Sequence, residues 1–241
     1  MRISVIVPAY NEERLLPESL RSIRAAMQAF DEAGWASELI VCDNKSTDRT
    51  AEIARLAGAR VVFEPVNQIS RARNTGAAAA AGDWLVFVDA DSFPTPALFA
   101  DLTAAIGSGR CLAGGATVAV ADGGRLAAAI VRSWNLLSRA TRWAAGSFFF
   151  CDTAIFRRIG GFSLTLYAAE EIDLSRRLKR IARRDGRRMV ILHRHPLLTS
   201  ARKAHLYTPR EALRFYSRLM LSGGRSLRTP EGAFIWYDGR R

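Results

Sequence analysis

Paired cysteines and long apolar runs are both missing from this sequence of 241 residues. Its three cysteines, Cys42, Cys111 and Cys151, lie far apart and form no CxxC pair, so neither a disulfide framework nor a zinc knuckle is indicated. No apolar run approaches the length of a membrane span, and the first one is interrupted by Pro8 and followed by acids, unlike a signal peptide. We therefore expect a cytoplasmic protein with reduced thiols.

Acidic residues are few relative to basic ones. Lys and Arg number 35 against 23 Asp and Glu, which gives a formal net charge of +12. Such a surface favours anionic partners such as nucleotides, phospholipid headgroups or nucleic acid. An Arg-rich codon usage explains the surplus equally well, so the charge alone selects no partner.

Strand-like and helix-like segments alternate along the first hundred residues. Short β-branched or aromatic runs predict strands at 3–7, 38–42, 61–63 and 84–88, and helical spacing predicts helices at 15–30, 48–57 and 69–81. Beyond residue 96 we expect helices at 97–106, 126–143, 170–183 and 209–221 and strands at 111–120, 148–151 and 189–193. This order predicts an α/β fold, with a mostly parallel sheet flanked by helices, in a single domain.

The predicted strand at 84–88 ends in two carboxylates, Asp89 and Asp91, separated by Ala90. Alternate side chains of an extended segment point the same way, so both acids can face one hard divalent cation, Mg²⁺ or Mn²⁺, that also takes phosphate oxygens. The structural alternative is that one acid caps the turn at Ser92-Phe93-Pro94. A lone DxD pattern is common, but its position after a buried strand favours the metal.

Other strands of the predicted sheet also end in polar groups. Tyr10 and Glu12 follow the first strand and Asp43 follows the second, while Arg71 and Arg73 lie on the next helix. Ligands of open parallel sheets bind beyond the carboxyl ends of the strands. Each residue alone is as well explained as a cap or a surface charge; together they indicate a binding site for an aromatic base and a phosphate.

Four motifs in this order resemble family 2 glycosyltransferases: VIVPAYNEE from Val5, DNKSTDRTAEIA at 43–54, ARNTGAAAAAGDWLVFVDADS at 72–92, and GGF at 160–162 followed by EEIDLSRRL at 170–178. The resemblance covers roughly the first 180 residues. It implies a GT-A (Rossmann-like) fold, a nucleotide-diphosphate sugar donor and a divalent metal. It also implies a nucleotide pocket lined by Pro8, Ala9, Tyr10, Glu12, Asp43 and Arg73, with Asp89 and Asp91 as the DxD pair and Asp91 the more direct metal ligand.

The resemblance further implies a catalytic base near the start of the helix at 170. The family usually has Glu-Asp there, whereas this sequence reads Glu170-Glu171-Ile172-Asp173. The base assignment therefore stays open among Glu170, Glu171 and Asp173, with Glu171 favoured. The helix dipole explains Glu170 equally well, and Asp173 has a helical ion-pair partner four residues on, Arg177.

Beyond this helix the candidates are weaker. Relatives that complete the metal shell with a histidine make His195 and His205 candidates, and Arg202 and Lys203 could neutralise a leaving diphosphate; a solvated basic loop is the alternative. The basic stretch at 176–184 is usually a solvated face, but it could rest on an anionic membrane. The aromatic segment at 234–241 is expected to pack back on the domain.

The sequence thus predicts a metal-dependent glycosyltransferase that transfers a sugar from a nucleotide-diphosphate donor to a hydroxyl of unknown identity. Residues 1–92 would form the nucleotide-binding half, 93–208 the acceptor side, and 209–241 a C-terminal helix and tail. Absence of the Gln-x-x-Arg-Trp motif favours a single transfer over processive synthesis. Direct attack by the acceptor would invert the anomeric carbon, and a retaining route stays open. A nucleotidyl transferase would normally need a Gly-rich loop such as GxxxxGK or GxGxxG near the first strand, and none is present.

Two other readings remain open, a nucleic-acid-binding module and a degenerate protein that binds nucleotide without turnover. The acidic strand ends argue against nucleic acid as a partner. The Glu171 departure from the family pattern is what makes a degenerate protein conceivable.

Overall fold

The computed structural model describes residues 1–120, 124–200 and 225–237, together with the single positions 211, 214, 217 and 222. The elements of the first half are β1 (Arg2–Ala9), α1 (Leu16–Glu32), β2 (Ala36–Asp43), α2 (Thr50–Leu56), β3 (Arg60–Phe63), α3 (Ile69–Ala79), β4 (Trp84–Val88), β5 (Ser92–Phe93) and α4 (Pro96–Gly107). Those of the second half are β6 (Cys111–Val120), α5 (Gly124–Thr141), β7 (Phe148–Asp152), α6 (Thr153–Arg158), α7 (Glu170–Arg184), β8 (Arg188–Thr199), the 3₁₀ turn η1 (Arg225–Arg228) and α10 (Phe234–Tyr237).

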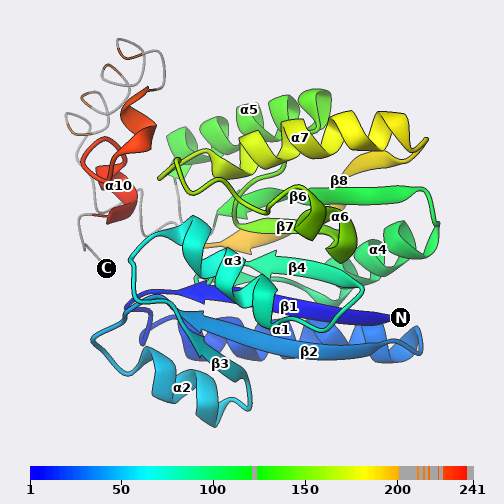
Figure 1. The fold of residues 1–241 in the computed structure, drawn as a ribbon, viewed down its shortest axis with the longest axis horizontal. Coiled ribbons are helices and arrows are strands. Elements are labelled where there is room, and N and C mark those ends of the chain that lie inside the picture. Colours follow the sequence, from blue (N-terminus) through cyan, green and yellow to red (C-terminus); the bar gives the residue numbers. More distant parts are fainter. Residues whose placement is uncertain are drawn as a thin grey trace.

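One eight-stranded sheet runs through the described residues in the order β3-β2-β1-β4-β7-β6-β8-β5 (Figure 1). The strands from β3 to β4 are parallel, since helices connect them. β7 runs antiparallel to both of its neighbours, β4 and β6, and β8 returns to pair with β6 in parallel. The predicted α/β domain with a mostly parallel sheet and flanking helices is confirmed.

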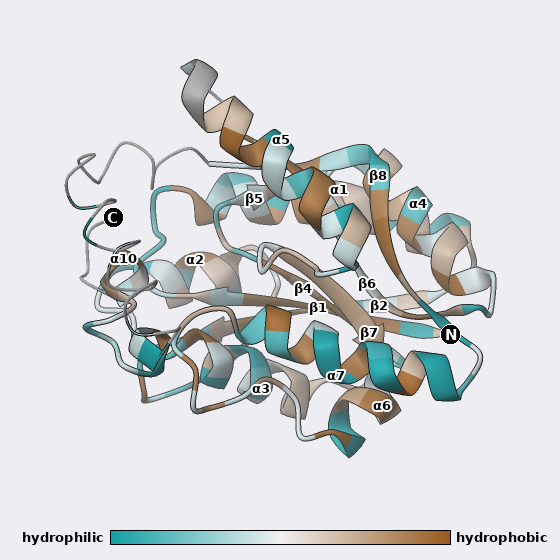
Figure 2. Cartoon of the chain, turned by 90° about the horizontal axis from the view of Figure 1, so that it is seen from above, coloured by the Kyte–Doolittle hydropathy of each residue, from teal (hydrophilic) through white to brown (hydrophobic). Residues whose placement is uncertain are grey.

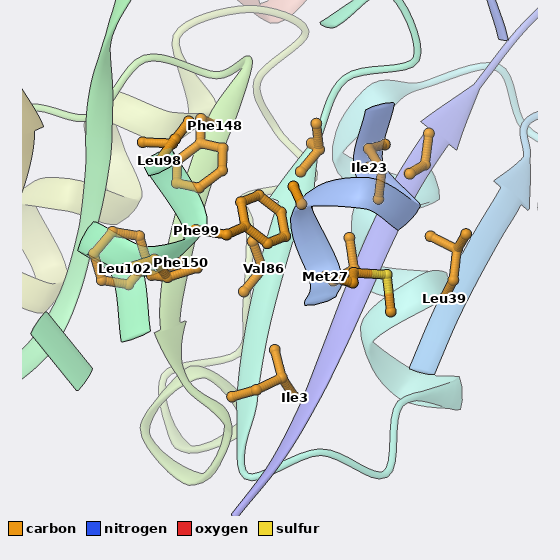
Figure 3. Packing of buried hydrophobic residues seen from close by; sticks show 14 of the residues in the cluster. Ile3, Ile23, Met27, Leu39, Val86, Leu98, Phe99, Leu102, Phe148 and Phe150 are labelled. Atoms are coloured by element: carbon orange, nitrogen blue, oxygen red, sulfur yellow. The ribbon is translucent and has the colours of Figure 1, made fainter. Parts of the chain in front are cut away.

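Helices cover both faces of the sheet and make two apolar clusters. Figure 3 shows part of the first, where Ile23 and Met27 of α1 and Phe99 of α4 pack against Val86 of β4. Leu174 and Leu178 of α7 belong to the second cluster, on the other face. Burying each such side chain contributes about 1.5–3 kcal/mol, so strands with apolar groups on both faces become the interior of the sheet.

Most predicted elements occur within a few residues of their expected bounds, and the differences have local causes. The prediction that Pro8 stops the first strand is wrong: β1 continues to Ala9, because parallel pairing to Cys42 and Asp43 persists beside the proline. The last strand reaches Thr199 rather than His193, and its pairing with β6 shifts register between Ala116 and Val118.

β5 and α6 are too short, at two and six residues, to leave a sequence pattern. The helix predicted at 209–221 lies almost entirely outside the described residues. Within the described part of the chain, no helix combines the length and apolarity needed to cross a bilayer.

Candidate active site

The two carboxylates that follow β4 line one cavity. It has an empty volume of about 530 Å³ and lies beyond the carboxyl ends of β1 and β4. Its walls are formed by Pro8, Ala9, Tyr10, Glu12, Asn44, Asn67, Ile69, Asp89, Ala90, Asp91 and Tyr237. The structure therefore brings the predicted residues Pro8, Ala9, Tyr10 and Glu12 together with both acids of the DxD pattern. Asp91 is 8% exposed, so its carboxylate is largely withdrawn from water.

A second cavity, of about 470 Å³, adjoins the first. Its walls are Ile69, Arg73, Asp89, Gly146, Ser147, Tyr167, Ala168, Ala169, Glu170 and Glu171. Asp89 and Ile69 line both cavities and so form the boundary between them. A group bound in one cavity would lie next to a group bound in the other.

Arg73 links the acids of the two cavities. Its Nη1 donates to Glu170 Oε1 at 2.6 Å, and its Nη2 donates to Asp89 Oδ1 and to the Gly146 carbonyl, each at 2.8 Å. The guanidinium also lies 5.2 Å from the centre of the Phe162 ring, a cation–π contact. Burial alone would lower the pKa of Arg73, but the carboxylates of Asp89 and Glu170 raise it above its usual value.

This placement differs from the prediction for Arg73. The residue is fully buried and borders the second cavity, not the one lined by Tyr10 and Asp91. Its helix α3 starts at the carboxyl edge of the sheet, so a side chain from its second turn points beneath the site. Arg73 therefore holds two acids in place rather than offering a free cation to a phosphate.

The three candidate bases at the start of α7 have different surroundings. Glu170 is 3% exposed and bound to Arg73, and Asp173 is bound to Arg177 at 2.8 Å. Glu171 is half-buried and lines the second cavity. Burial raises the pKa of Glu171 to about 8, and the negative charge of Glu170 adds to the effect. Burial also raises the pKa of Glu170, since one guanidinium faces three carboxylates.

The turn before α7 is fixed by Asn74 of the ARNTG motif. Its Oδ1 accepts from the Phe162 amide and its Nδ2 donates to the Phe162 carbonyl, both at 2.9 Å. Gly161 has φ +68°, and a Cβ there would lie 2.6 Å from Asn74 Oδ1. Arg177 completes the turn by donating to the carbonyls of Ile159 and Gly161. Asn74 of α3 and Arg177 of α7 thus hold the turn of the GGF motif between these two helices.

The motif at the end of β2 has a mainly structural role in the described contacts. Asp43 is buried, accepts from the Ser46 amide and does not line the first cavity, although the adjacent Asn44 does. Asn44 also bonds the carbonyls of Glu64 and Val66 and the amide of Gln68, which fixes the loop entering α3. Arg71 is half-buried on α3 and lines neither cavity.

Of the two predicted histidine ligands only His195 lies in the described residues, and it does not join the site. His195 lies in β8, where its Nδ1 is 3.0 Å from Asp101 Oδ2 of α4, and it lines neither cavity. Because His195 is paired with the carboxylate of Asp101 and lies outside both cavities, we do not propose it as a metal ligand. His205, Arg202 and Lys203 lie outside the described residues.

Tyr237 lines the first cavity, although no sequence pattern predicts a residue of the C-terminal segment there. It comes from α10, and its hydroxyl accepts from the Ile69 amide at 3.2 Å. Its ring packs edge-on against Tyr167 of the second cavity, with centroids 5.3 Å apart. The Tyr167 amide in turn donates to the Leu227 carbonyl at 2.7 Å. Tyr237, the last described residue of the aromatic C-terminal segment, thus packs on the domain as expected, and it joins the wall of the first cavity to Tyr167 of the second.

The first cavity has the donor atoms that suit a divalent cation. Asp91 and Asp89 present carboxylate oxygens to the same space, and Arg73 compensates part of the charge of Asp89 only. Hard cations such as Mg²⁺ and Mn²⁺ prefer oxygen ligands. No group of three acidic, histidine or cysteine side chains gathers around a metal position within the described residues. The carboxylates of Asp89 and Asp91 are therefore residues that fit a hard divalent cation.

Comparison with known proteins finds a matching family model and relatives that match over part of their length. A family model described as "Glycosyl transferase family 2" matches residues 4–165. A 4,4'-diaponeurosporenoate glycosyltransferase of Staphylococcus haemolyticus (strain JCSC1435) is 41% identical over 96 residues, which cover 37% of this chain and 24% of that protein. The uncharacterized glycosyltransferase EpsJ of Bacillus subtilis (strain 168) is 36% identical over 106 residues, 42% of this chain and 29% of that one. The matches therefore span less than a third of the length of either relative.

Solved structures share the fold. The mannosyltransferase PcManGT from Pyrobaculum calidifontis, in complex with GDP-Man and Mn²⁺, superposes with a TM-score of 0.66 at 21% identity. That superposition covers 91% of this chain and 61% of the mannosyltransferase.

Proposed function

The chain belongs to glycosyl transferase family 2, and on that premise we propose that it transfers a sugar from a nucleotide-diphosphate sugar to an acceptor hydroxyl. The observation that carries the proposal is the pair of adjoining cavities. One holds the DxD carboxylates, the other holds Glu171, and Asp89 lies between them. The anomeric carbon of a donor in the first cavity would then face an acceptor oxygen in the second.

The first cavity would bind the nucleoside diphosphate. Tyr10 would place its ring against a base, and Asn67 would offer its amide group to the edge of the base or to the ribose. Asn44, whose side chain already bonds Glu64, Val66 and Gln68, would only shape the wall. Asp91, with Asp89, would hold Mg²⁺ or Mn²⁺ against the diphosphate oxygens. When bound, such a cation neutralises the charge that develops on the leaving diphosphate.

Glu171 would act as the general base. The acceptor oxygen attacks the anomeric carbon, the bond from that carbon to the diphosphate oxygen breaks, and the acceptor proton passes to the Glu171 carboxylate. A pKa of about 8 makes this carboxylate a stronger base than an exposed glutamate. Attack from the face opposite the leaving group inverts the anomeric centre, so we propose a single inverting transfer.

The cysteines take no part in this chemistry. All three are buried and free, and burial raises the pKa of Cys42 and of Cys111 to about 12. Unpaired thiols of this kind suit a reducing compartment, so we propose that the reaction takes place in the cytoplasm.

A thermal-shift screen tests the donor site directly. We expect one of UDP, GDP or dTDP to raise the melting temperature, and Mn²⁺ to enlarge that shift. Asp91→Asn should remove the Mn²⁺-dependent part. Asp31→Asn, which changes an exposed acid of α1 outside both cavities, should keep it. Failure of every nucleotide to stabilise the protein would end the proposal.

The anomeric configuration of the product tests the role of Glu171. With the donor found in the screen, NMR of the product should show the inverted anomer. A retained configuration would remove the base role of Glu171 while leaving the donor site intact. Binding without any turnover would instead indicate a nucleotide-binding protein that has lost activity.

A further inference from the structure

Helix α5 presents an apolar face away from the body of the protein. Asn135 and Ser138 mark its inner side: Asn135 bonds both the amide and the carbonyl of Val118 in β6, and buried Ser138 donates to the Trp143 carbonyl at 2.6 Å. At 100° per residue, the opposite side carries Ala129, Ile130, Ser133, Leu136, Leu137 and Ala140, all of them exposed.

This helix face is unusually exposed to solvent for a surface made mainly of apolar side chains. Ile130, Leu136 and Leu137 are 56%, 67% and 44% exposed, within about two turns of one helix. Scattered single apolar residues on a surface are ordinary, but a contiguous apolar strip marks a contact surface. Figure 2 shows brown segments along α5 between teal and pale ones, whereas α7, on the other side of the sheet, is mainly teal.

Cations flank the strip and acids are missing from it. Arg132 and Arg139, seven residues apart, lie exposed along one side of the strip, and Arg142 is exposed just beyond its end. No Asp or Glu occurs between Gly124 and Cys151. Arg132, Leu136 and Arg139 also border a groove that α5 forms with β6 and β8, and the described walls of this groove include no acid.

The basic face of α7 continues the same charge. Arg176, Arg180, Arg183 and Arg184 are exposed on α7. Two contacts join α7 to the end of α5: Lys179 Nζ donates to the Thr141 carbonyl at 2.5 Å, and the Arg176 guanidinium lies 4.8 Å from the centre of the Trp143 ring. The end of α5 therefore adjoins the basic face of α7, and we name the apolar strip of α5, its flanking arginines and this basic face the α5–α7 surface.

We propose that the α5–α7 surface docks on an anionic lipid bilayer, with the apolar strip of α5 entering the headgroup region. An apolar helix face bordered by Lys or Arg is the pattern of helices that lie in the plane of a membrane interface. Anionic headgroups complement the arginines, and each cation near such a surface adds to the affinity. A second copy of this chain fits less well, because arginines would meet arginines across a symmetric contact of this surface.

The docking would also place the second cavity near the bilayer. The chain leaves α5 and reaches Gly146 and Ser147, two walls of that cavity, within six residues of Thr141. This inference goes beyond the proposed transfer of a sugar and does not depend on it, because membrane binding can be measured without donor or acceptor.

Vesicle sedimentation tests the proposal on the unmodified protein. We expect binding to vesicles that contain phosphatidylglycerol at low salt, weaker binding at high salt, and little binding to phosphatidylcholine alone. Arg132→Gln with Arg139→Gln should weaken binding by about thirtyfold, at roughly fivefold per cation. Ile130→Ser with Leu137→Ser should weaken it by about tenfold through lost apolar insertion.

The matched control lies on α2, where Arg55 is exposed and Leu56 is 77% exposed. Arg55→Gln with Leu56→Ser removes one cation and one apolar side chain from another part of the surface and should leave binding unchanged. Equal loss in this control and in the α5 variants would show nonspecific attraction by net charge and overturn the proposal. No binding of the unmodified protein to anionic vesicles would also overturn it.

A site-specific probe gives an independent reading. All natural cysteines are buried, so Ser133→Cys can be labelled selectively with a polarity-sensitive dye. We expect a blue shift of its emission on anionic vesicles and none on adding more protein. A blue shift that instead follows protein concentration, with a larger mass on gel filtration, would assign the strip to a second copy of the chain.

Discussion

At the scale of single residues, one buried arginine lies among three acids of the site and bonds two of them. Arg73 is buried beneath the site and bonds Asp89 and Glu170, while Glu171 faces the second cavity. Burial raises the pKa of Glu171 to about 8 and the negative charge of Glu170 adds to the shift, while Arg73, bonded to the other two acids, offsets it only in part. Glu171 therefore keeps a proton to a higher pH than an exposed glutamate does.

The pH dependence of activity follows from this raised pKa. The base must be deprotonated, so we expect the rate to rise with pH through about 8, the value for Glu171. Glu171→Gln should reduce kcat by about 10²–10⁴-fold and remove this limb, with little change in nucleotide affinity. A variant that keeps the limb would show that another group titrates. Asp173→Asn, which breaks only the bond to Arg177, serves as the matched acid control and should keep it.

Glu171→Gln should also stabilise the folded protein. The pKa of Glu171 is raised in the folded state, so its protonated form is favoured there, and stability declines as pH rises from the unfolded value toward about 8. Glu171→Gln removes this loss, and we expect its unfolding free energy to exceed the parent's by about 1–2 kcal/mol at pH 9. Urea denaturation at pH 9 and pH 5 measures the effect. An equal difference at both pH values would contradict the ionisation as its cause.

Loss of Arg73 should destabilise the folded protein. Arg73→Met leaves buried Glu170 and half-buried Asp89 without their cation, which we expect to cost about 3–5 kcal/mol of unfolding free energy at pH 8. The cost should shrink at pH 5, because burial raises the pKa of Glu170 and this acid can take up a proton there. Adding Glu170→Gln to Arg73→Met should recover part of the loss, and an unchanged double variant would show that the pairing is not its source.

At the scale of elements, the site depends on where α7 begins. Gly161 takes φ +68° and sits against Asn74, and this turn leads to Glu170 and Glu171. Gly161→Ala should cost about 1–2 kcal/mol for the left-handed backbone alone and more for the contact with Asn74 Oδ1. Gly109, with φ +69° and open space around its Cβ position, provides the control. Equal destabilisation of Gly109→Ala and Gly161→Ala would contradict a role for the contact.

We expect the short helix α10 to contribute to nucleotide binding through Tyr237. Tyr237 accepts from the Ile69 amide at the start of α3 and forms part of the first cavity. Tyr237→Phe removes one hydrogen bond and should weaken nucleoside diphosphate binding by about two- to tenfold. Tyr237→Ala also opens the wall and should weaken it further. Calorimetry measures both, and equal affinity in Tyr237→Ala and the parent would exclude α10 from the donor site.

At the scale of the whole molecule, local patterns predicted the sheet because each strand has its own signal. The strand at 84–88 was predicted to the residue, since Trp84 to Val88 are apolar and are bounded by Asp83 and Asp89. Alternation with helices then implied parallel pairing. The two-residue β5 has no pattern of its own and exists only through pairing with Leu198 and Thr199.

The site could be predicted only where its residues lie in short motifs. Asp89 and Asp91 follow a strand whose end is visible in the sequence, and so do Tyr10 and Glu12. The burial of Arg73 could not be predicted, because arginine is usually exposed and its partner Glu170 is 97 residues away. The same holds for His195 with Asp101 and for Tyr237 with Ile69, which are 94 and 168 residues apart. Contacts at such separations are decided by the fold.

The most direct test of the central claim is electron paramagnetic resonance of Mn²⁺ titrated into the protein with the nucleoside diphosphate that the thermal screen selects. The account predicts that the free Mn²⁺ signal falls when protein and nucleotide are present together, well beyond the loss due to nucleotide alone. Asp91→Asn should restore the signal. Equal Mn²⁺ binding by Asp91→Asn and the parent would contradict the claim that these strand-end carboxylates hold the donor's metal.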